Sequence, residues 1–177
     1  MHQQATDFPY QKIPGYKWVW GIIVGLIALS YYPLPGMIVF LIGVGMSMRV
    51  LNSPANKSAR LYNKGLHVYK KGFKDMAIQL WEEALKKDSL NIYPHQALCY
   101  LYHDYEKNPA LALEHGKKAL ELDAHNTRVG YKVGKILYEM GDFPQAAHIL
   151  QSLDLQGELA EERAKLLKKC LAGPKTK

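Results

Sequence analysis

The chain has 177 residues, which is enough for one domain of ordinary size and a short additional segment. Its formal net charge is +7, but the excess is concentrated in one stretch. Seven basic and no acidic residues lie between Arg49 and Lys74, whereas 14 basic and 15 acidic residues follow that stretch. A nucleic-acid-binding protein needs a broad basic face, so this local band argues against that class.

The chain has two cysteines, Cys99 and Cys170, which are too few for a disulfide framework. Cys99 falls on the packing side of an expected helix, where a small apolar residue fits. We therefore expect a reduced domain that faces the cytosol.

The first element is an uncharged run of 31 residues, from Trp18 to Met48. About 20 apolar residues suffice for a helix to cross a bilayer, so the run is too long for one ordinary span and for a signal peptide. In its middle, Pro33 and Pro35 remove two backbone donors and disfavour helix at the residues before them. The run therefore predicts a transmembrane hairpin. Its predicted bounds are 18–49 for the hairpin, about 17–33 and 35–50 for the two helices, and Pro33–Gly36 for the turn.

Basic residues flank the run at both ends, and its middle carries no charge. This distribution fits a hairpin whose two ends lie on the cytoplasmic side of a cell or inner membrane. A single tilted, proline-kinked span is the main alternative, and a re-entrant loop or a buried soluble pair of helices also stays open. Residues 1–17 are then a cytosolic or interfacial segment, and residues 50–57 form a basic linker.

Small residues in the run would allow two membrane helices to approach closely. They are Gly21, Gly25, Gly43 and Gly45. We expect them to be used for packing within the hairpin. A basic band would lie at the membrane surface just after the run, and it consists of Arg49, Lys57, Arg60 and Lys64. The band satisfies the positive-inside rule and can also attract anionic lipid headgroups.

From Ser58 onward the sequence repeats with a period of about 34 residues. Four positions of the first unit line up with positions 69 residues later: Gly65, Gly72, Ala77 and Trp81 align with Gly134, Gly141, Ala146 and Leu150. The period is typical of stacked helix–turn–helix units, and it predicts an all-α fold. We expect Gly72 to adopt a left-handed turn, Gly65 to let two helices approach, and Trp81 to fill the space between units.

These residues resemble the tetratricopeptide repeat (TPR) family. The first unit matches the family pattern at Gly65, Gly72, Ala77, Trp81 and Ala84, and the third at Gly134, Tyr138, Gly141, Phe143, Ala146 and Leu150. The second unit lacks the turn glycine, has one extra residue near Asp104–Pro109, and carries Gly116 where an aromatic is usual. The resemblance implies a three-unit solenoid over residues 58–153, with units 58–91, 92–126 and 127–153, and a capping helix and basic tail over 154–177.

In this family the first helix of each unit lines a concave groove. The resemblance implies that the groove is formed by Tyr62, Leu66 and Tyr69, by Tyr93, Gln96, Tyr100 and His103, and by Arg128, Tyr131, Lys135 and Tyr138. Each unit contributes two tyrosines seven residues apart, which places both on one helix face. Tyrosine is favoured at recognition surfaces, so a protein partner is expected there. The alternative is that some of these tyrosines pack against neighbouring elements.

No sequence pattern for catalysis stands out. The seven histidines are scattered, and the sequence contains neither a paired Cys-x-x-Cys nor a phosphate-binding glycine loop. We therefore expect a protein that is not an enzyme and that has no cofactor, no metal site and no small-molecule substrate. Tyr62 and Leu66 also replace the first residues of the lysine/asparagine pattern with which chaperone-binding members hold a C-terminal carboxylate.

The resulting hypothesis is an integral membrane TPR scaffold. It would hold a peptide or helix of a partner protein, which we expect to be a subunit of a membrane complex. In this way it would aid the assembly or stability of that complex. The alternative is a hairpin-driven membrane oligomer, a remodelling or pore-type element that the repeats regulate. The absence of charge within the run counts against a conducting path.

Overall fold

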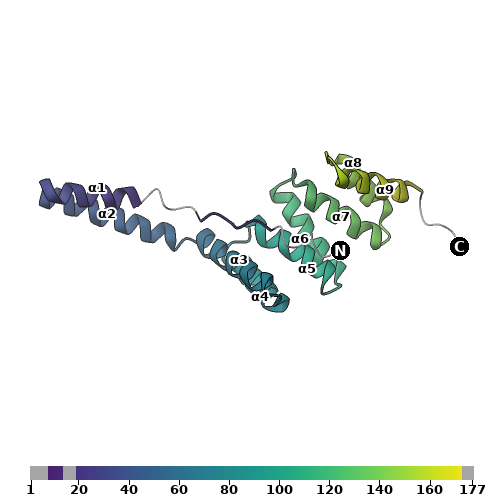
Figure 1. The fold of residues 1–177 in the computed structure, drawn as a ribbon, viewed down its shortest axis with the longest axis horizontal. Helices are drawn as coiled ribbons and strands as arrows, with labels where there is room; N and C mark the ends of the chain where they lie inside the picture. The colour runs from purple at the N-terminus through teal and green to yellow at the C-terminus, as the bar shows by residue number, and fades with distance from the viewer. Residues whose placement is uncertain (1–7, 14–18, 173–177) are drawn as a thin grey trace. The chain divides into compact units, whose positions relative to one another are not determined.

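The computed structural model describes residues 8–13 and 19–172, and all regular structure in these ranges is helical (Figure 1). The helices are α1 (Val19–Tyr31), α2 (Pro33–Leu51), α3 (Pro54–Lys70), α4 (Lys74–Lys87), α5 (Ile92–Asp104), α6 (Pro109–Leu122), α7 (Thr127–Glu139), α8 (Phe143–Ser152) and α9 (Glu158–Ala172). Most of the predicted N-terminal segment, the predicted start of the first membrane helix and the basic tail lie outside the described residues.

The chain divides into two compact units. One unit is Pro9–Asn91, which contains α1 to α4. The described parts of the other are Phe8 and residues 92–172, which contain α5 to α9. The first predicted repeat is therefore grouped with the apolar hairpin, and the second and third repeats are grouped with the capping helix.

The helices α1 and α2 form a hairpin and pack along each other (Figure 1). The break between them is Tyr32 alone, one residue before the predicted turn. Pro33 and Pro35 lie in the first turn of α2, where a backbone N–H has no partner within the helix, so proline is tolerated there. Residues 33–36 are thus helical, and the prediction of a turn at Pro33–Gly36 is wrong.

Glycines allow the close approach of α1 and α2. A Cβ atom on Gly25 would lie 2.6 Å from the Phe40 Cα, and one on Gly43 would lie 2.8 Å from the Gly21 carbonyl carbon. Gly45 has no such neighbour within 4 Å, so it does not take part in this contact. Three of the four predicted small residues therefore lie between the two helices.

Only one described helix, α2, is long and apolar enough to cross a membrane by length and composition. α1 is apolar but has only 13 residues in the described part of the chain. The structure thus contains the predicted pair of apolar helices, and within the described residues one of the two is shorter than a span requires.

A serine–proline pair starts α3 earlier than expected. The Ser53 hydroxyl caps the helix by accepting a hydrogen bond from the Asn56 N–H at 3.3 Å, and Pro54 occupies the first turn. Residues 54–57, predicted as linker, are helical as a result. The non-helical connection between α2 and α3 is Asn52–Ser53.

The helix pair of the first repeat, α3 and α4, closes around Trp81. A Cβ atom on Gly65 would lie 2.5 Å from the Trp81 Nε1, and that nitrogen donates a hydrogen bond to the Tyr62 carbonyl oxygen at 3.1 Å. Trp81 is fully buried, and its ring stacks on Tyr62. It therefore packs inside the first repeat against α3, and its predicted place between repeat units stays a prediction.

In the second repeat, Gly116 has a packing role that the family pattern does not suggest. A Cβ atom there would lie 2.5 Å from the Val133 Cγ2 and 3.0 Å from the Cys99 Sγ. The missing side chain lets α6 contact both α5 and α7. Cys99 is buried at this contact, and burial raises the pKa of its thiol to about 12, so it remains protonated.

The turns inside the three repeats use the same left-handed backbone conformation. Gly72 and Gly141 have φ angles of +93° and +86°, as predicted for Gly72. In the longer turn of the second repeat, Lys107 takes this conformation with φ at 55°. A side chain makes that conformation unfavourable, and glycine carries no such cost.

We therefore expect the substitution Lys107→Gly to stabilise the protein by about 0.5–1 kcal/mol, because it removes this strain. Denaturant unfolding followed by circular dichroism measures the change. Glu106→Gly is the matched control and should destabilise, since Glu106 does not have a positive φ. Equal effects of the two substitutions would contradict the assignment.

Candidate functional site

The helices α5 and α7 carry most of the predicted groove residues. On α5, Tyr93, Gln96, Tyr100 and His103 are spaced by three or four residues and share one face. Arg128, Tyr131, Lys135 and Tyr138 follow the same spacing on α7. All eight side chains are partly or fully exposed. Only Arg128 and Lys135 are exposed, and the other six are partly buried.

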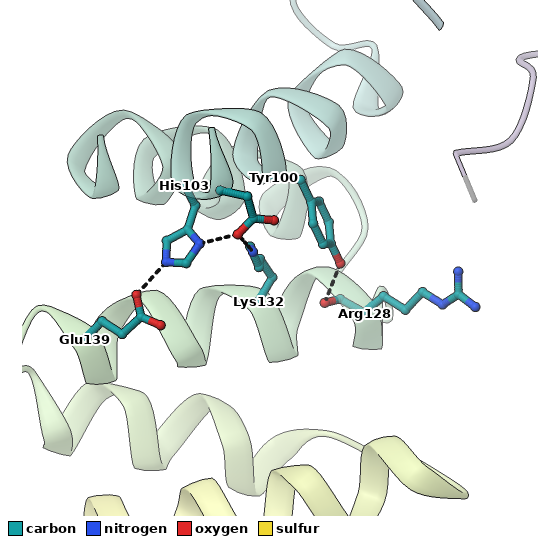
Figure 2. Close-up of polar contacts among 6 residues, drawn as sticks. Tyr100, His103, Arg128, Lys132 and Glu139 are labelled. Carbon is teal, nitrogen blue, oxygen red and sulfur yellow. Dashed lines mark hydrogen bonds and ion pairs between the residues drawn. The ribbon is translucent and has the colours of Figure 1, made fainter. Parts of the chain in front are cut away.

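Polar contacts join α5 to α7 (Figure 2). The Tyr100 hydroxyl donates a hydrogen bond to the Arg128 carbonyl oxygen at 3.2 Å. The His103 ring lies between two carboxylates: its Nε2 is 2.7 Å from Glu139 Oε2, and its Nδ1 is 2.7 Å from Asp104 Oδ1. These residues, with Lys132, form what we call the α5–α7 polar cluster: Tyr100, His103, Asp104, Arg128, Lys132 and Glu139.

Lys132 is the buried cation of the cluster. Only 4% of the residue is exposed, and its ammonium group lies 2.5 Å from Asp104 Oδ1 and 5.0 Å from the centre of the Tyr100 ring. A buried charge is costly unless it is paired, and here a carboxylate and an aromatic face compensate it. The position of α7 against α5 is therefore tied to this ion pair.

The neighbours of Asp104 in the cluster lower the pKa of its carboxyl group. Partial burial by itself would raise the pKa of Asp104, but hydrogen bonds from His103 and Lys132 outweigh burial and lower the pKa to about 2. Burial is also the main cause that raises the pKa of Tyr100 above its usual value. The carboxylate is therefore charged and the phenol neutral throughout the physiological range.

At the other edge of α7, Tyr131 contacts the capping helix. Its hydroxyl donates a hydrogen bond to Glu162 Oε2 at 3.0 Å. Burial, followed by this hydrogen bond, raises the pKa of Tyr131 to about 12. Tyr138 packs edge-on against Phe143, and on α5 the Tyr100 ring contacts Phe8 in the same manner, at 5.6 Å between ring centres. Tyr100, Tyr131 and Tyr138 are thus partly exposed, and each is held by a contact with a neighbouring side chain.

The α5–α7 polar cluster includes three residues that sequence reasoning missed: Asp104, Lys132 and Glu139. Tyr100, His103 and Arg128, the other members of the cluster, were predicted because they occupy positions that line the groove in the TPR family. The three missed residues lie outside those positions. A lysine at a position that is buried in α7 could have been noticed as a cation in need of a partner. Within residues 8–13 and 19–172, no three histidine, cysteine, aspartate or glutamate side chains come together as metal ligands.

In the first repeat the structure places two predicted groove residues in the core. Tyr62 and Leu66 are fully buried, and the Tyr62 ring stacks on Trp81. Tyr69 is partly buried and lies 5.8 Å from the Trp81 ring centre. The expectation that Tyr62 and Leu66 present surface to a partner is therefore wrong for this state of the protein.

The predicted basic band is exposed at all four of its residues. Arg49 lies in the last turn of α2, and Lys57, Arg60 and Lys64 follow on α3. Spacings of three and four residues place the three α3 residues along one side of the helix. The band therefore continues from the end of the apolar helix onto the first repeat.

Comparison with known proteins supports the repeat fold. Residues 105–170 match the family model described as tetratricopeptide repeat. The fold is similar to that of a solved structure described as the first TPR of Spaghetti (RPAP3) bound to the HSP90 peptide SRMEEVD. The match has a TM-score of 0.61 and 19% sequence identity, and it covers 70% of this chain and 99% of that chain. No curated protein matches the sequence. The predicted all-α, TPR-like fold is confirmed.

The ion pair between Asp104 and Lys132 should make the free energy of unfolding depend on pH. Asp104→Asn should lower the free energy of unfolding at pH 7 by about 1–3 kcal/mol, because it leaves the Lys132 ammonium without its carboxylate. The folded-state pKa of Asp104 is about 2, against an ordinary value of 3.8. The stabilisation is therefore fully present above about pH 4 and is lost as the pH falls toward 2.

Urea unfolding of the original chain and the variant at pH 7, 4 and 3 measures this difference. We expect the gap between the two proteins to be largest at pH 7 and to narrow below pH 4. Glu106→Gln removes an exposed carboxylate two residues away and is the matched control. A gap that does not change with pH would contradict the role of the Asp104 charge.

Proposed function

We propose that this protein is a membrane-anchored TPR scaffold. Its hairpin fixes it in a bilayer, and the face formed by α5 and α7 holds a peptide or helix of a partner protein. The natural task for such an arrangement is to aid the assembly or stability of a membrane protein complex. The observation that carries the proposal is the apolar surface that α1 and α2 leave uncovered.

The uncovered surface runs around both helices of the hairpin. More than half of each of the following side chains is exposed: Trp20, Leu26, Ile27, Ile38, Leu41 and Ile42. Water-soluble proteins rarely expose contiguous apolar surface of this kind. A bilayer would cover all sides of the hairpin at once, and the exposed Arg49 at the end of α2 suits the headgroup region.

Partner binding is supported by the α5–α7 face. Partly exposed tyrosines alternate there with Arg128 and Lys135, which combines apolar area with charge. The similar solved structure holds an HSP90 peptide, so a fold of this kind can bind a peptide ligand. In this chain Tyr62 and Leu66 occupy the positions of the chaperone clamp and are buried, so we propose a partner other than a chaperone tail.

The proposal includes a cytoplasmic location for the repeats, because basic residues lie at both ends of the apolar run. It treats the protein as a binding protein without catalytic activity or cofactor. A hairpin-driven oligomer receives less support, since Gly21, Gly25 and Gly43 already serve the contact between α1 and α2. Attraction of the basic band to anionic lipid remains part of the proposal.

Thiol labelling of intact cells tests the topology. In a background with Cys99→Ser and Cys170→Ser, we expect Lys12→Cys and Asp154→Cys to be protected from a membrane-impermeant reagent and Tyr32→Cys to be labelled. A hairpin places its break on the far side of the membrane from both flanks, which explains this pattern. Labelling of Lys12→Cys from outside would indicate a single span. Protection of all three would contradict a spanning hairpin.

Site-specific photo-cross-linking in native membranes tests the binding face. A benzophenone residue in place of Lys135, on α7, should form an adduct of discrete mass with a partner protein. The same probe in place of Lys117, exposed on α6, is the matched control and should form none. Adding Arg128→Glu should reduce the Lys135 adduct by about 10-fold, as expected when a charge on a binding face is reversed. Equal adducts at the two positions would contradict the assignment of the face.

A further inference from the structure

The N-terminal segment of the chain is bound on α3 through its backbone. The Asn63 side chain accepts a hydrogen bond from the Gln11 N–H at 2.9 Å and donates one to the Gln11 carbonyl oxygen at 2.9 Å. One side-chain amide thus satisfies both backbone groups of one residue, as a neighbouring strand would. Such a pair recognises an extended backbone without regard to the side chain that it carries.

A second amide recognises the side chain of the same residue. The Asn91 side chain, which is buried, donates a hydrogen bond to Gln11 Oε1 at 2.9 Å. Its second N–H bonds to the Ser58 hydroxyl at 2.8 Å, which fixes the orientation of the amide. A donor held in this way selects a ligand residue with a side-chain oxygen of the length of glutamine.

Two further contacts hold the residues before Gln11. The Tyr62 hydroxyl donates a hydrogen bond to the Pro9 carbonyl oxygen at 3.0 Å, and the Lys70 ammonium lies 4.6 Å above the centre of the Tyr10 ring. Four side chains of the first repeat and its following turn therefore converge on three consecutive residues. Helix α3 contributes Tyr62, Asn63 and Lys70 to this set.

The segment itself buries little surface. Tyr10 is 54% exposed, and Pro9 and Lys12 are also exposed. Hydrogen bonds to the protein replace hydrogen bonds to water, so they contribute a modest net stabilisation. The geometry is thus specific, but the segment can be released without opening the core of the repeat.

We propose that Pro9–Gln11 is an internal ligand, and that its site on α3 also accepts an extended peptide of a partner with glutamine at the position of Gln11. The partner peptide and the internal segment compete for Asn63 and Asn91. This inference rests on the proposed function of the repeats as a peptide-binding scaffold. The first repeat is then closed to partners until its own segment leaves.

Competition with a synthetic peptide of residues 8–13 tests the proposal on the full-length chain in lipid nanodiscs. In the original chain the internal segment occupies the site, so added peptide should bind weakly. Gln11→Pro removes the N–H that Asn63 accepts and should release the segment. The peptide should then bind about 10-fold more tightly or better, because a larger fraction of the protein is open.

Two further variants show whether Asn63 forms the site. Asn63→Ala should also release the segment, seen as faster amide hydrogen exchange of residues 8–13, but it should not bind added peptide. Asn63→Asp keeps the acceptor for the Gln11 N–H and loses the donor. Its amide exchange of residues 8–13 should therefore lie between that of the original chain and that of Asn63→Ala. Lys12→Ala is the matched control and should change neither exchange nor binding. Unchanged exchange in α4 shows that each variant remains folded.

Unchanged exchange of residues 8–13 in Asn63→Ala would overturn the internal contact. Release of the segment in Gln11→Pro without a gain in peptide binding would overturn the competition. The Lys135 cross-link reports on the second unit and does not depend on either result. Failure of that cross-link alone would therefore contradict the proposed scaffold function and leave the contact of Pro9–Gln11 with α3 in place.

Discussion

The missing Cβ atom of a glycine at a helix crossing is the constraint on which the helical pairs of this protein depend. Gly65 makes room for Trp81, Gly134 for the Leu150 side chain, and Gly25 for the backbone at Phe40. Because interiors are close-packed, a helix pair that meets at such a point cannot simply move apart to admit a methyl group. The same device thus closes the helix pairs of the repeats and the apolar hairpin, although the surroundings proposed for the two differ.

Within the second unit a buried charge adds to this packing. Lys132 lies in the interior side of α7, and the carboxylate of Asp104 at the end of α5 pairs with it. Burial of an unpaired ammonium would be costly, so the ion pair restricts how α5 and α7 can pack. The arrangement leaves the neighbouring tyrosines partly exposed and holds their helices in one relative position. A binding face benefits from such support, since side chains that are already positioned lose less freedom when a ligand binds.

How far the sequence predicts the site differs between the two units. On α5 and α7, the positions implied by the family resemblance gave eight residues that the structure leaves at least partly exposed. On α3 the same family positions failed at Tyr62 and Leu66, which are both fully buried; the Tyr62 ring stacks on Trp81 and its hydroxyl donates a hydrogen bond to the Pro9 carbonyl oxygen. The pairing of Gln11 with Asn63, 52 residues away, has no periodic signal. Contacts between an extended segment and a helix depend on where the chain returns in space.

The sequence by itself determined the helical character of the chain, the repeat period, the left-handed turn at Gly72 and the existence of an apolar pair of helices. Each follows from local rules, namely the spacing of apolar residues, the conformational freedom of glycine and the lack of an N–H in proline. Only the tertiary structure decided which tyrosines are buried, which carboxylate pairs with Lys132 and where Pro9–Gln11 binds. Those outcomes depend on contacts between residues far apart in the chain, and such contacts are set by how whole helices pack.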